Sequence, residues 1–308
     1  MKLLITGACG HIGSFLIEHI HQIKKINEVF LIDNFISQRY SSLFNLKKKI
    51  KFKFLNLDLS ENTLNLIPKV DYVIHCASYT NAENSFKIKK EMFRNNLRCM
   101  KNIIYYCIKN QSKLIHISST SVYGKQSKLV NEEDVALLKP QSPYAEIKLI
   151  EENLLKKNTK KITFNTFRFG TISGVSKGMR FHTAINKFCL NAALNEKINI
   201  YKTAYNQFRP YLSLKDSFKI FKYCIEKNMF TNDIYNVLSA NYTVKQIIKI
   251  IKKFKKNIRI KFVKSKIMNQ LSYKVDGSKI KNLGIKLNSS IEKDIKDTLH
   301  LFKNIILK

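Results

Sequence analysis

The chain has 308 residues, of which 44% are hydrophobic and 25% charged, a balance that excludes intrinsic disorder and allows one large domain or two unequal lobes. The formal net charge of +33 makes nucleic acid and acidic membrane surfaces partners to consider. Arginine supplies only 7 of the 55 basic residues and the lysines are scattered, whereas proteins that read nucleic acid rely on arginine, so we expect a solvated basic surface and no specific nucleic-acid partner.

The six cysteines form no Cys-x-x-Cys pair and no cluster with histidine at zinc spacing. Most of them lie in apolar segments, so we interpret them as reduced core residues and expect no metal site. The apolar run at the N-terminus is too short for a signal peptide, and no segment approaches the roughly 18 apolar residues that span a bilayer. These features predict a cytoplasmic protein without a membrane partner.

Strands and helices alternate along the first half of the chain. Short apolar runs predict buried strands, and segments with apolar residues at helical spacing predict the helices between them. The repeated strand–helix–strand order favours a parallel sheet covered by helices on both faces, an α/β fold of the doubly wound type. The predicted strands are 2–6, 29–33, 51–56, 72–76, 113–118 and 163–169, and the predicted helices are 10–25, 89–110 and 143–157.

Beyond Gly170 this regular alternation loosens, and a polar segment with two further glycines predicts a loop-rich region. No internal repeat and no low-complexity linker interrupts the remainder of the chain. The patterns there predict one strand over 209–214 and helices over 183–195, 216–227, 244–256 and 290–302.

A glycine-rich turn joins the first predicted strand to the first predicted helix. Gly7, Gly10 and Gly13 allow the backbone to approach a pyrophosphate, which the free N–H groups of the helix N-terminus then bind. Taken alone, the turn is also compatible with an ordinary strand–turn–helix connection. We count the intervening His11 and Ile12 with the glycines as cofactor-binding candidates.

The second predicted strand ends at Asp33, 20 positions after Gly13. An acidic residue at this place hydrogen-bonds the ribose hydroxyls of NAD and repels the additional phosphate of NADP. Asn34 follows, and no arginine occurs before Arg39, so we favour NAD over NADP. A solvated residue at the end of a strand is the alternative interpretation of Asp33.

The next two strands end in further cofactor-binding candidates. Asp58 and Leu59 close the third strand, where the adenine would lie, although an aspartate at that position also suits a plain turn. Small residues close the fourth strand and leave room for a cofactor to cross the strand ends; they are Cys76, Ala77 and Ser78.

Tyr144 and Lys148 are four residues apart on a predicted helix and therefore share one face. A phenol normally titrates near pH 10, but a neighbouring ammonium and the positive nicotinamide ring of NAD⁺ lower its pKa, so that tyrosine can accept the proton of an alcohol. Ser119, at the end of the preceding strand, can hydrogen-bond the same hydroxyl. In a lysine-rich chain this spacing alone would more often mark a solvated helix face.

Together these motifs resemble the extended short-chain dehydrogenase/reductases, and within them the NAD-dependent sugar-nucleotide epimerase/dehydratase group that includes UDP-galactose 4-epimerase. The resemblance spans essentially the whole chain, with its motifs in the expected order. It includes the run SSTSVYG, the Pro143-Tyr144-x-x-x-Lys148 motif, Asn96, Arg168 with Gly174, and the segments 209–216, 234–241 and 275–285.

The resemblance implies a doubly wound Rossmann lobe that binds NAD (1–168 with 207–238) and a smaller C-terminal lobe that binds a nucleotide-diphosphate sugar (169–206 with 239–308). By similarity, Tyr144 is the catalytic base, Lys148 lowers its pKa and binds the nicotinamide ribose, and Ser119 orients the sugar hydroxyl. Asn96 would support Lys148 indirectly. Related enzymes often form homodimers through the helices that contain Tyr144 and Asn96.

Two residues after Ser119 help to choose the reaction. Dehydratases of this group have acidic residues where this chain has Thr120 and Ser121, so the pattern favours an epimerase that forms a transient 4-keto sugar. A nucleotide-sugar reductase or dehydrogenase is the alternative within the group. A non-catalytic nucleotide- or RNA-binding Rossmann protein is the alternative of another class.

The substrate-binding candidates beyond Ser119 and Thr120 are Thr171, Arg180 and Arg209. The two arginines could bind the diphosphate bidentately, although a surface salt bridge is an alternative for each. Thr171 stands where the group often has asparagine, and Thr80 where UDP-galactose 4-epimerase has lysine. Among the histidines, His75 and His116 are predicted core residues and His182 is a candidate for the substrate pocket.

Overall fold

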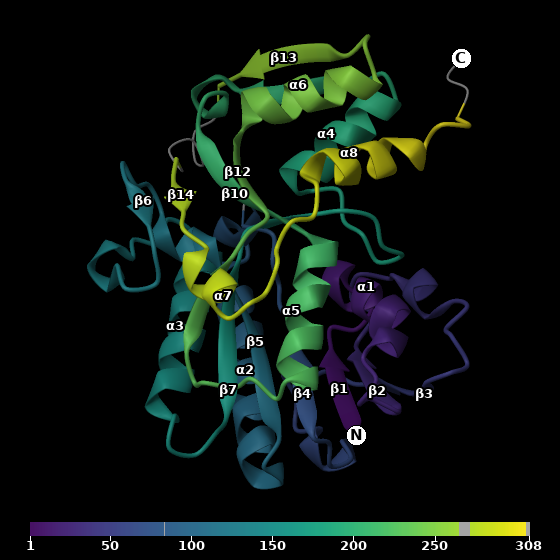
Figure 1. Cartoon of the computed structure of the whole chain (residues 1–308), viewed down its shortest axis with the longest axis vertical. Coiled ribbons are helices and arrows are strands. Elements are labelled where there is room, and N and C mark those ends of the chain that lie inside the picture. Colours follow the sequence, from purple (N-terminus) through teal and green to yellow (C-terminus); the bar gives the residue numbers. More distant parts are fainter. Residues whose placement is uncertain (83, 265–271, 306–308) are drawn as a thin grey trace.

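The computed structural model describes residues 1–82, 84–264 and 272–305. Its larger part is a seven-stranded sheet in the order β11-β7-β5-β4-β1-β2-β3, with neighbouring strands parallel (Figure 1). This confirms the predicted doubly wound α/β fold. The strands are β1 (Lys2–Thr6), β2 (Glu28–Asp33), β3 (Lys51–Asn56), β4 (Tyr72–His75), β5 (Lys113–Ser119), β7 (Phe164–Phe169) and β11 (Ile234–Val237).

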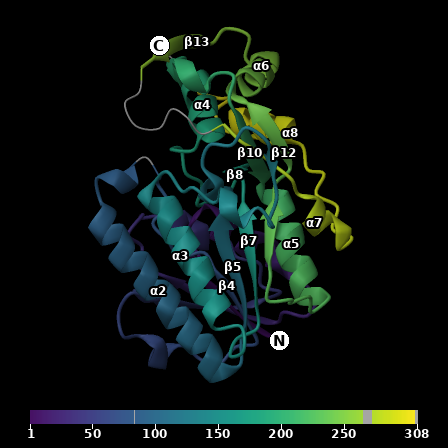
Figure 2. The ribbon, with the colours of Figure 1, turned by 90° about the vertical axis from the view of Figure 1, so that its left-hand side faces the viewer.

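Helices pack on both faces of this sheet (Figure 2). On one face lie α1 (His11–His19) and α5 (Leu214–Glu226), and on the other α2 (Lys89–Asn110) and α3 (Pro143–Lys157). Successive side chains of a strand point to opposite faces, so Leu4 of β1 enters the core under α2 while its neighbours enter the core under α1. Burial on both faces explains why these strands are continuous apolar runs.

The start of α3 is set by its first residues. Ser142 precedes the helix, and its Oγ accepts a hydrogen bond from Ala145 N at 3.2 Å. Pro143 occupies the first helical position, where its missing N–H costs nothing. These two residues place Tyr144 at the helix start, and Lys148 follows one turn later.

A smaller lobe lies beyond the carboxyl ends of the large sheet's strands (Figure 1). Its three helices pack against one another and against short strands around a separate apolar core. It contains a sheet of β12 (Ala240–Thr243), β10 (Phe208–Ser213) and β8 (Thr171–Ser173), the pair β9 (Lys197–Tyr201) and β13 (Arg259–Val263), and the helices α4 (Ala184–Ala193), α6 (Val244–Phe254) and α8 (Ile291–His300). The remaining elements are the paired strands β6 (Leu129–Val130) and β14 (Lys274–Val275) and the short helix α7 (Ser278–Asn282).

The six predicted strands of the large sheet agree closely with the structure, but its seventh strand, β11, and several strands of the small lobe were not predicted. The helix predicted over 10–25 ends at His19 and continues as a 3-10 turn to Gln22. The strands β8, β9, β12 and β13 are three to five residues long, so each offers too few apolar residues for a clear pattern. β11 belongs to the large sheet and β10 to the small one. The division into a lobe of 1–168 with 207–238 and a lobe of 169–206 with 239–308 stays a prediction. No described helix has both the length and the apolar character needed to cross a bilayer.

Candidate active site

The glycine-rich turn has no room for side chains at two of its three glycines. Gly7 has a φ of +62°, and a Cβ there would lie 2.6 Å from Ala77 N. A Cβ on Gly13 would lie 2.4 Å from Gly7 O. Gly10 precedes α1 without a side-chain cap, which leaves the first N–H groups of the helix available to an anion.

Carboxylates at the ends of β2 and β3 lie next to this turn. Asp33 accepts hydrogen bonds from Cys9 N and from Phe35 N, both at 2.9 Å. Asp58 accepts from Asn34 Nδ2 at 2.9 Å, and although burial opposes its charge, hydrogen bonds from Ser60 and Asn34 lower its pKa. The structure therefore brings the predicted adenosine-binding residues together. Leu59 is buried and packs in the core beneath them.

The end of β4 packs against the glycine turn. Thr6 Oγ1 lies 2.7 Å from His75 Nδ1 and accepts a hydrogen bond from Ala77 N at 3.3 Å. Burial raises the pKa of the Cys76 thiol to about 12, so this cysteine is a neutral wall residue. Cys76 and Ser78 line the cavity described next, while Ala77 packs against Gly7.

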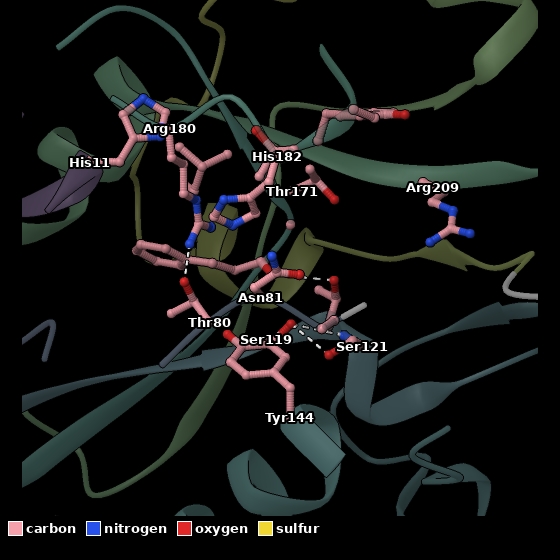
Figure 3. Close-up of a pocket in the computed structure, with 18 of the residues that line it drawn as sticks. His11, Thr80, Asn81, Ser119, Ser121, Tyr144, Thr171, Arg180, His182 and Arg209 are labelled. Atoms are coloured by element: carbon pink, nitrogen blue, oxygen red, sulfur yellow. Dashed lines mark hydrogen bonds between the residues drawn. The ribbon is translucent and has the colours of Figure 1, made fainter. Parts of the chain in front are cut away.

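A cavity of about 530 Å³ lies between the two lobes, over the carboxyl ends of the strands (Figure 3). Both lobes contribute to its wall. Its cationic lining residues are Arg39, Lys148, Arg180, Lys187 and Arg209, and none of the described residues that line it is an aspartate or glutamate. Such a cavity suits ligands with several negative charges.

Tyr144, Ser119 and Ser121 lie together at this cavity (Figure 3). Ser119 Oγ lies 2.8 Å from Ser121 Oγ and accepts a hydrogen bond from Ser121 N at 3.2 Å. Ser119 ends β5, and the short 3-10 helix Thr120–Tyr123 turns Ser121 back toward it. The arrangement presents a phenol and a hydroxyl to the same ligand.

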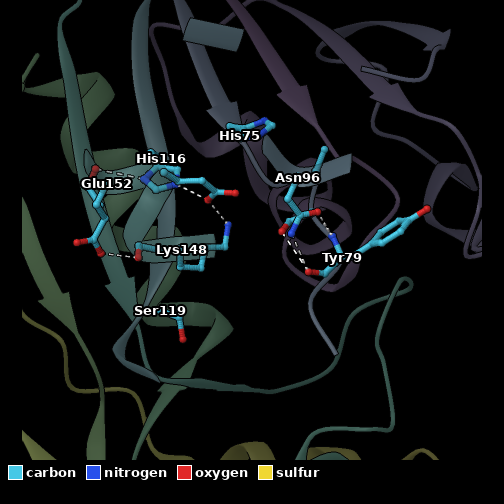
Figure 4. Close-up of polar contacts among 12 residues, drawn as sticks. His75, Tyr79, Asn96, His116, Ser119, Lys148 and Glu152 are labelled. Atoms are coloured by element: carbon cyan, nitrogen blue, oxygen red, sulfur yellow. Dashed lines mark hydrogen bonds and ion pairs between the residues drawn. The ribbon is translucent and has the colours of Figure 1, made fainter. Parts of the chain in front are cut away.

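Lys148 lies behind Tyr144, with its Nζ 6.0 Å from the centre of the Tyr144 ring. Its ammonium donates to Glu151 Oε2 at 2.7 Å (Figure 4). The resemblance implied that Asn96 supports Lys148 indirectly, which stays a prediction. In the structure Asn96 bonds to the main chain of Tyr79, with Oδ1 accepting at 2.8 Å and Nδ2 donating at 3.1 Å. Asn96 therefore orders the loop after β4, and the hydrogen-bond partner of Lys148 is Glu151.

Arg180 and Arg209 lie at different sides of the cavity and do not form one clamp (Figure 3). Arg180 donates from Nη1 to Thr80 Oγ1, and its Nε has no hydrogen-bond partner among the described residues. Burial lowers the pKa of Arg180, while the nearby Tyr144 favours its charge. A cation from the loop after β8 therefore stands beside Thr80 in the loop after β4.

His11 joins the glycine turn to the loop after β8. Its Nε2 lies 2.8 Å from Gly174 O, and its buried Nδ1 has no partner among the described residues. Burial, together with Arg180, lowers the pKa of His11 to about 3, so the ring is neutral.

The other predicted substrate-binding residues also line the cavity, but not all of their side chains are free of hydrogen bonds within the protein. Thr171 on β8 lines it, whereas the Thr120 hydroxyl donates to Phe169 O at 3.2 Å. His182 lines it as expected, and burial lowers its pKa to about 4. His75 and His116 are buried, which confirms them as core residues.

Sequence reasoning missed several residues of this site. Glu151 had a local signal, an acidic residue three positions after Lys148 on the same helix. Asn81 and the cavity-lining residues of the small lobe had no such signal, because they reach the cavity through packing of distant segments. Those from the small lobe include Lys187, Asn199, Tyr211 and Tyr273.

Comparison with known proteins gives consistent matches. The model of the NAD dependent epimerase/dehydratase family matches residues 3–237. dTDP-D-glucose 4,6-dehydratase of Dictyostelium discoideum is 27% identical over 364 residues, covering 98% of this chain and 82% of that protein. UDP-glucose 4-epimerase of Yersinia enterocolitica is 31% identical over 163 residues, covering 51% of this chain and 48% of that protein.

A solved structure resembles the whole chain. The UDP-glucuronic acid 4-epimerase of Bacillus cereus, in complex with UDP-glucuronic acid and NAD, superposes with a TM-score of 0.89 at 24% identity, covering 98% of this chain and 99% of that one. Dehydratases and epimerases thus both occur among the similar proteins, and the choice between their reactions depends on the residues of the site.

Proposed function

Because the chain belongs to the NAD dependent epimerase/dehydratase family of sugar-nucleotide enzymes, whose solved relatives hold NAD, we propose that it epimerises a nucleotide-diphosphate sugar. The reaction would pass through a transient 4-keto sugar. The cofactor is NAD. The residues of the site support epimerisation as the reaction.

The residues at the glycine turn fit NAD. Gly7 and Gly13 keep the turn packed tightly against its own main chain and the end of β4, and the uncapped N-terminus of α1 after Gly10 leaves N–H groups for a pyrophosphate. His11 Nδ1 is buried without a partner among the described residues, as expected of a group that faces a ligand. Asp33, at the end of β2, has lone pairs left for ribose hydroxyls. NAD supplies the capacity to accept a hydride and to return it.

The chain's own residues then handle the proton. Tyr144 Oη takes the proton of the sugar's C4 hydroxyl as the C4 hydride leaves, and it returns the proton after the keto sugar has turned over. Lys148 stabilises the phenolate, because its ammonium lies on the same helix face. Ser119 Oγ holds the sugar oxygen in line with Tyr144. The cationic cavity wall binds the diphosphate.

One observation carries the choice of epimerisation over water elimination. Elimination needs a group that protonates the departing hydroxyl, and carboxyl groups serve as such acids. Positions 120 and 121 are Thr and Ser, and none of the described lining residues is acidic. The Thr120 hydroxyl is already bonded to Phe169 O.

We also propose a cytoplasmic homodimer formed through α2 and α3. These helices lie side by side on one face of the sheet (Figure 2). Tyr105 on α2 is 60% exposed and Ile150 on α3 is 36% exposed, which would suit an apolar contact with a second copy. A monomer in light scattering at micromolar concentration would contradict this assembly.

The function is tested by incubating the protein with UDP-hexoses, UDP-N-acetylhexosamines and UDP-uronic acids and identifying products by NMR and mass spectrometry. An epimer of unchanged mass, formed without net NADH, is expected. A product lighter by one water would make the protein a dehydratase, and steady consumption of added NADH a reductase.

Tyr144→Phe should reduce turnover by about 10²- to 10⁴-fold, because the proton acceptor is lost, while NAD binding persists. Tyr105→Phe removes the hydroxyl of an exposed tyrosine that does not line the cavity and keeps its apolar ring, so it serves as the control, with turnover unchanged. Undiminished turnover of the Tyr144 variant would refute the mechanism.

A further inference from the structure

A buried carboxylate is bonded to the lysine of the active site. Lys148 donates to Glu151 Oε2 at 2.7 Å, and the two side chains are 4% and 1% exposed. The same oxygen lies 2.9 Å from His116 Nε2 on β5 (Figure 4). Glu151 therefore connects the helix that presents Tyr144 to the central sheet.

His116 holds Glu151 in one place. Its Nδ1 lies 3.2 Å from Thr166 Oγ1 on β7. An ionised carboxylate only accepts hydrogen bonds, so Nε2 of His116 donates to Glu151. Both ring nitrogens of His116 have a partner, and the position of Glu151 is set by two strands of the sheet.

Glu151 also sets the charge of the site. Burial by itself would lower the pKa of Lys148, but the attraction and hydrogen bond of Glu151 outweigh it and the pKa is raised. Burial opposes the charge of Glu151 in turn, yet Lys148 and His116 lower its pKa to about 2. Both groups are consequently ionised at neutral pH.

Three further groups near this pair are neutral. His75, at the end of β4, has a pKa lowered to about 3 by burial. Burial raises the pKa of Cys76 on the β4 side and of Cys99 on α2 to about 12 each. His116 on β5 and Tyr144 on α3 are the remaining titratable neighbours. Lys148 and Glu151 therefore form an ion pair at the floor of the cavity.

We propose that Glu151 is a positioning residue for the Tyr144–Lys148 pair, holding the Lys148 ammonium charged and fixed at the floor of the cavity. Lys148 has three N–H donors, and Glu151 accepts a hydrogen bond from one of them. The other two would be available to a ribose hydroxyl of bound NAD and to the Tyr144 phenolate. The inference rests on the proposed catalytic use of Tyr144 and Lys148.

The test compares two adjacent glutamates of α3. Glu151→Gln removes the anion that faces Lys148, whereas Glu152→Gln removes an equally buried anion that pairs with Arg168 instead. NADH is titrated into each full-length protein across alkaline pH, with nicotinamide fluorescence as the readout, and the pH profile of epimerisation is measured in parallel.

Glu151→Gln is expected to weaken NADH binding severalfold. It should also move the alkaline limb of both profiles to lower pH by about 1 to 3 units, because Lys148 loses the charge that raises its pKa. Glu152→Gln should lower the melting temperature but leave the alkaline limb of both profiles at the same pH as in the unaltered protein. If both variants lose stability but keep that limb, Glu151 is a structural residue and the proposal is wrong.

Glu151→Asp covers the case in which the glutamine variant does not fold. Its carboxylate is one methylene shorter, so a smaller shift of the alkaline limb in the same direction is expected, and an unchanged limb overturns the proposal. NADH binding can be measured without a sugar substrate. If the alkaline limb of NADH binding depends on Glu151 but no sugar nucleotide is epimerised, the proposed function is wrong while the proposal for Glu151 stands.

Discussion

Gly13 lies in the first turn of α1, where a Cβ would come within 2.4 Å of Gly7 O and 2.6 Å of Ala8 O. Both are main-chain atoms, so they can move only if the whole turn moves. Gly10 is less crowded, since a Cβ there would meet Gly7 O at 3.2 Å. At the scale of single residues, the cofactor site thus depends on main-chain packing as well as on side chains.

Gly13→Ala should lower the free energy of unfolding by about 1–3 kcal/mol through overpacking and should abolish co-purification of NAD. Gly10→Ala, in the same turn, should have a smaller effect on both. Urea unfolding and mass spectrometry of the purified proteins provide the measurement. Equal NAD content in the two variants would show that the close approach at Gly13 is not needed.

At the scale of elements, α3 uses adjacent residues for different tasks. Glu151 faces Lys148 and β5, whereas Glu152 pairs with Arg168 of β7, which donates from Nε at 2.9 Å and from Nη2 at 2.7 Å. Ser118 donates to Glu152 as well, at 2.6 Å, and Arg168 Nη1 donates to Tyr123 at 2.8 Å. This buried network fastens α3, and with it Tyr144, to the sheet.

Arg168→Met should lower the free energy of unfolding by about 3–5 kcal/mol, because it leaves Glu152 buried without its counter-ion. Lys253→Met on α6 is the comparison, since it breaks the exposed ion pair with Glu292 and should change stability by less than about 1 kcal/mol. Denaturant unfolding of both variants measures the difference. Similar losses in the two would contradict a structural role for the buried pair.

At the scale of the whole molecule, two lobes enclose a cationic cavity within a chain of net charge +33. Scattered surface lysines attract polyanions without selecting a sequence. The cavity differs from the surface in concentrating arginine, which binds phosphate in a bidentate manner. The excess of basic residues therefore does not require a nucleic-acid function.

We expect the protein to bind unrelated RNA sequences equally and weakly, with affinity falling steeply as salt rises, because released counter-ions supply the binding free energy. Filter binding of two RNAs of different sequence at low and physiological ionic strength measures this. Selective binding that persists at physiological salt would instead support the nucleic-acid alternative.

Local patterns were sufficient to predict the frame of this protein. The helix Pro143–Lys157 and the strand Lys51–Asn56 were predicted to the residue, because hydrophobic periodicity and capping residues act over neighbouring positions. The glycine spacing, Asp33 and the Tyr144–Lys148 motif were likewise legible, since each depends on residues within one or two adjacent elements.

Contacts between distant segments could not be read from such patterns. The bond from Arg180 to Thr80 joins residues 100 positions apart, and that from His116 to Glu151 joins residues 35 apart. Both depend on how helices, loops and lobes pack, which no local spacing encodes. The chain's periodicity was therefore enough to predict the cofactor fold, while the bond that ties Glu151 to β5 and the residues that close the cavity emerged from three-dimensional packing.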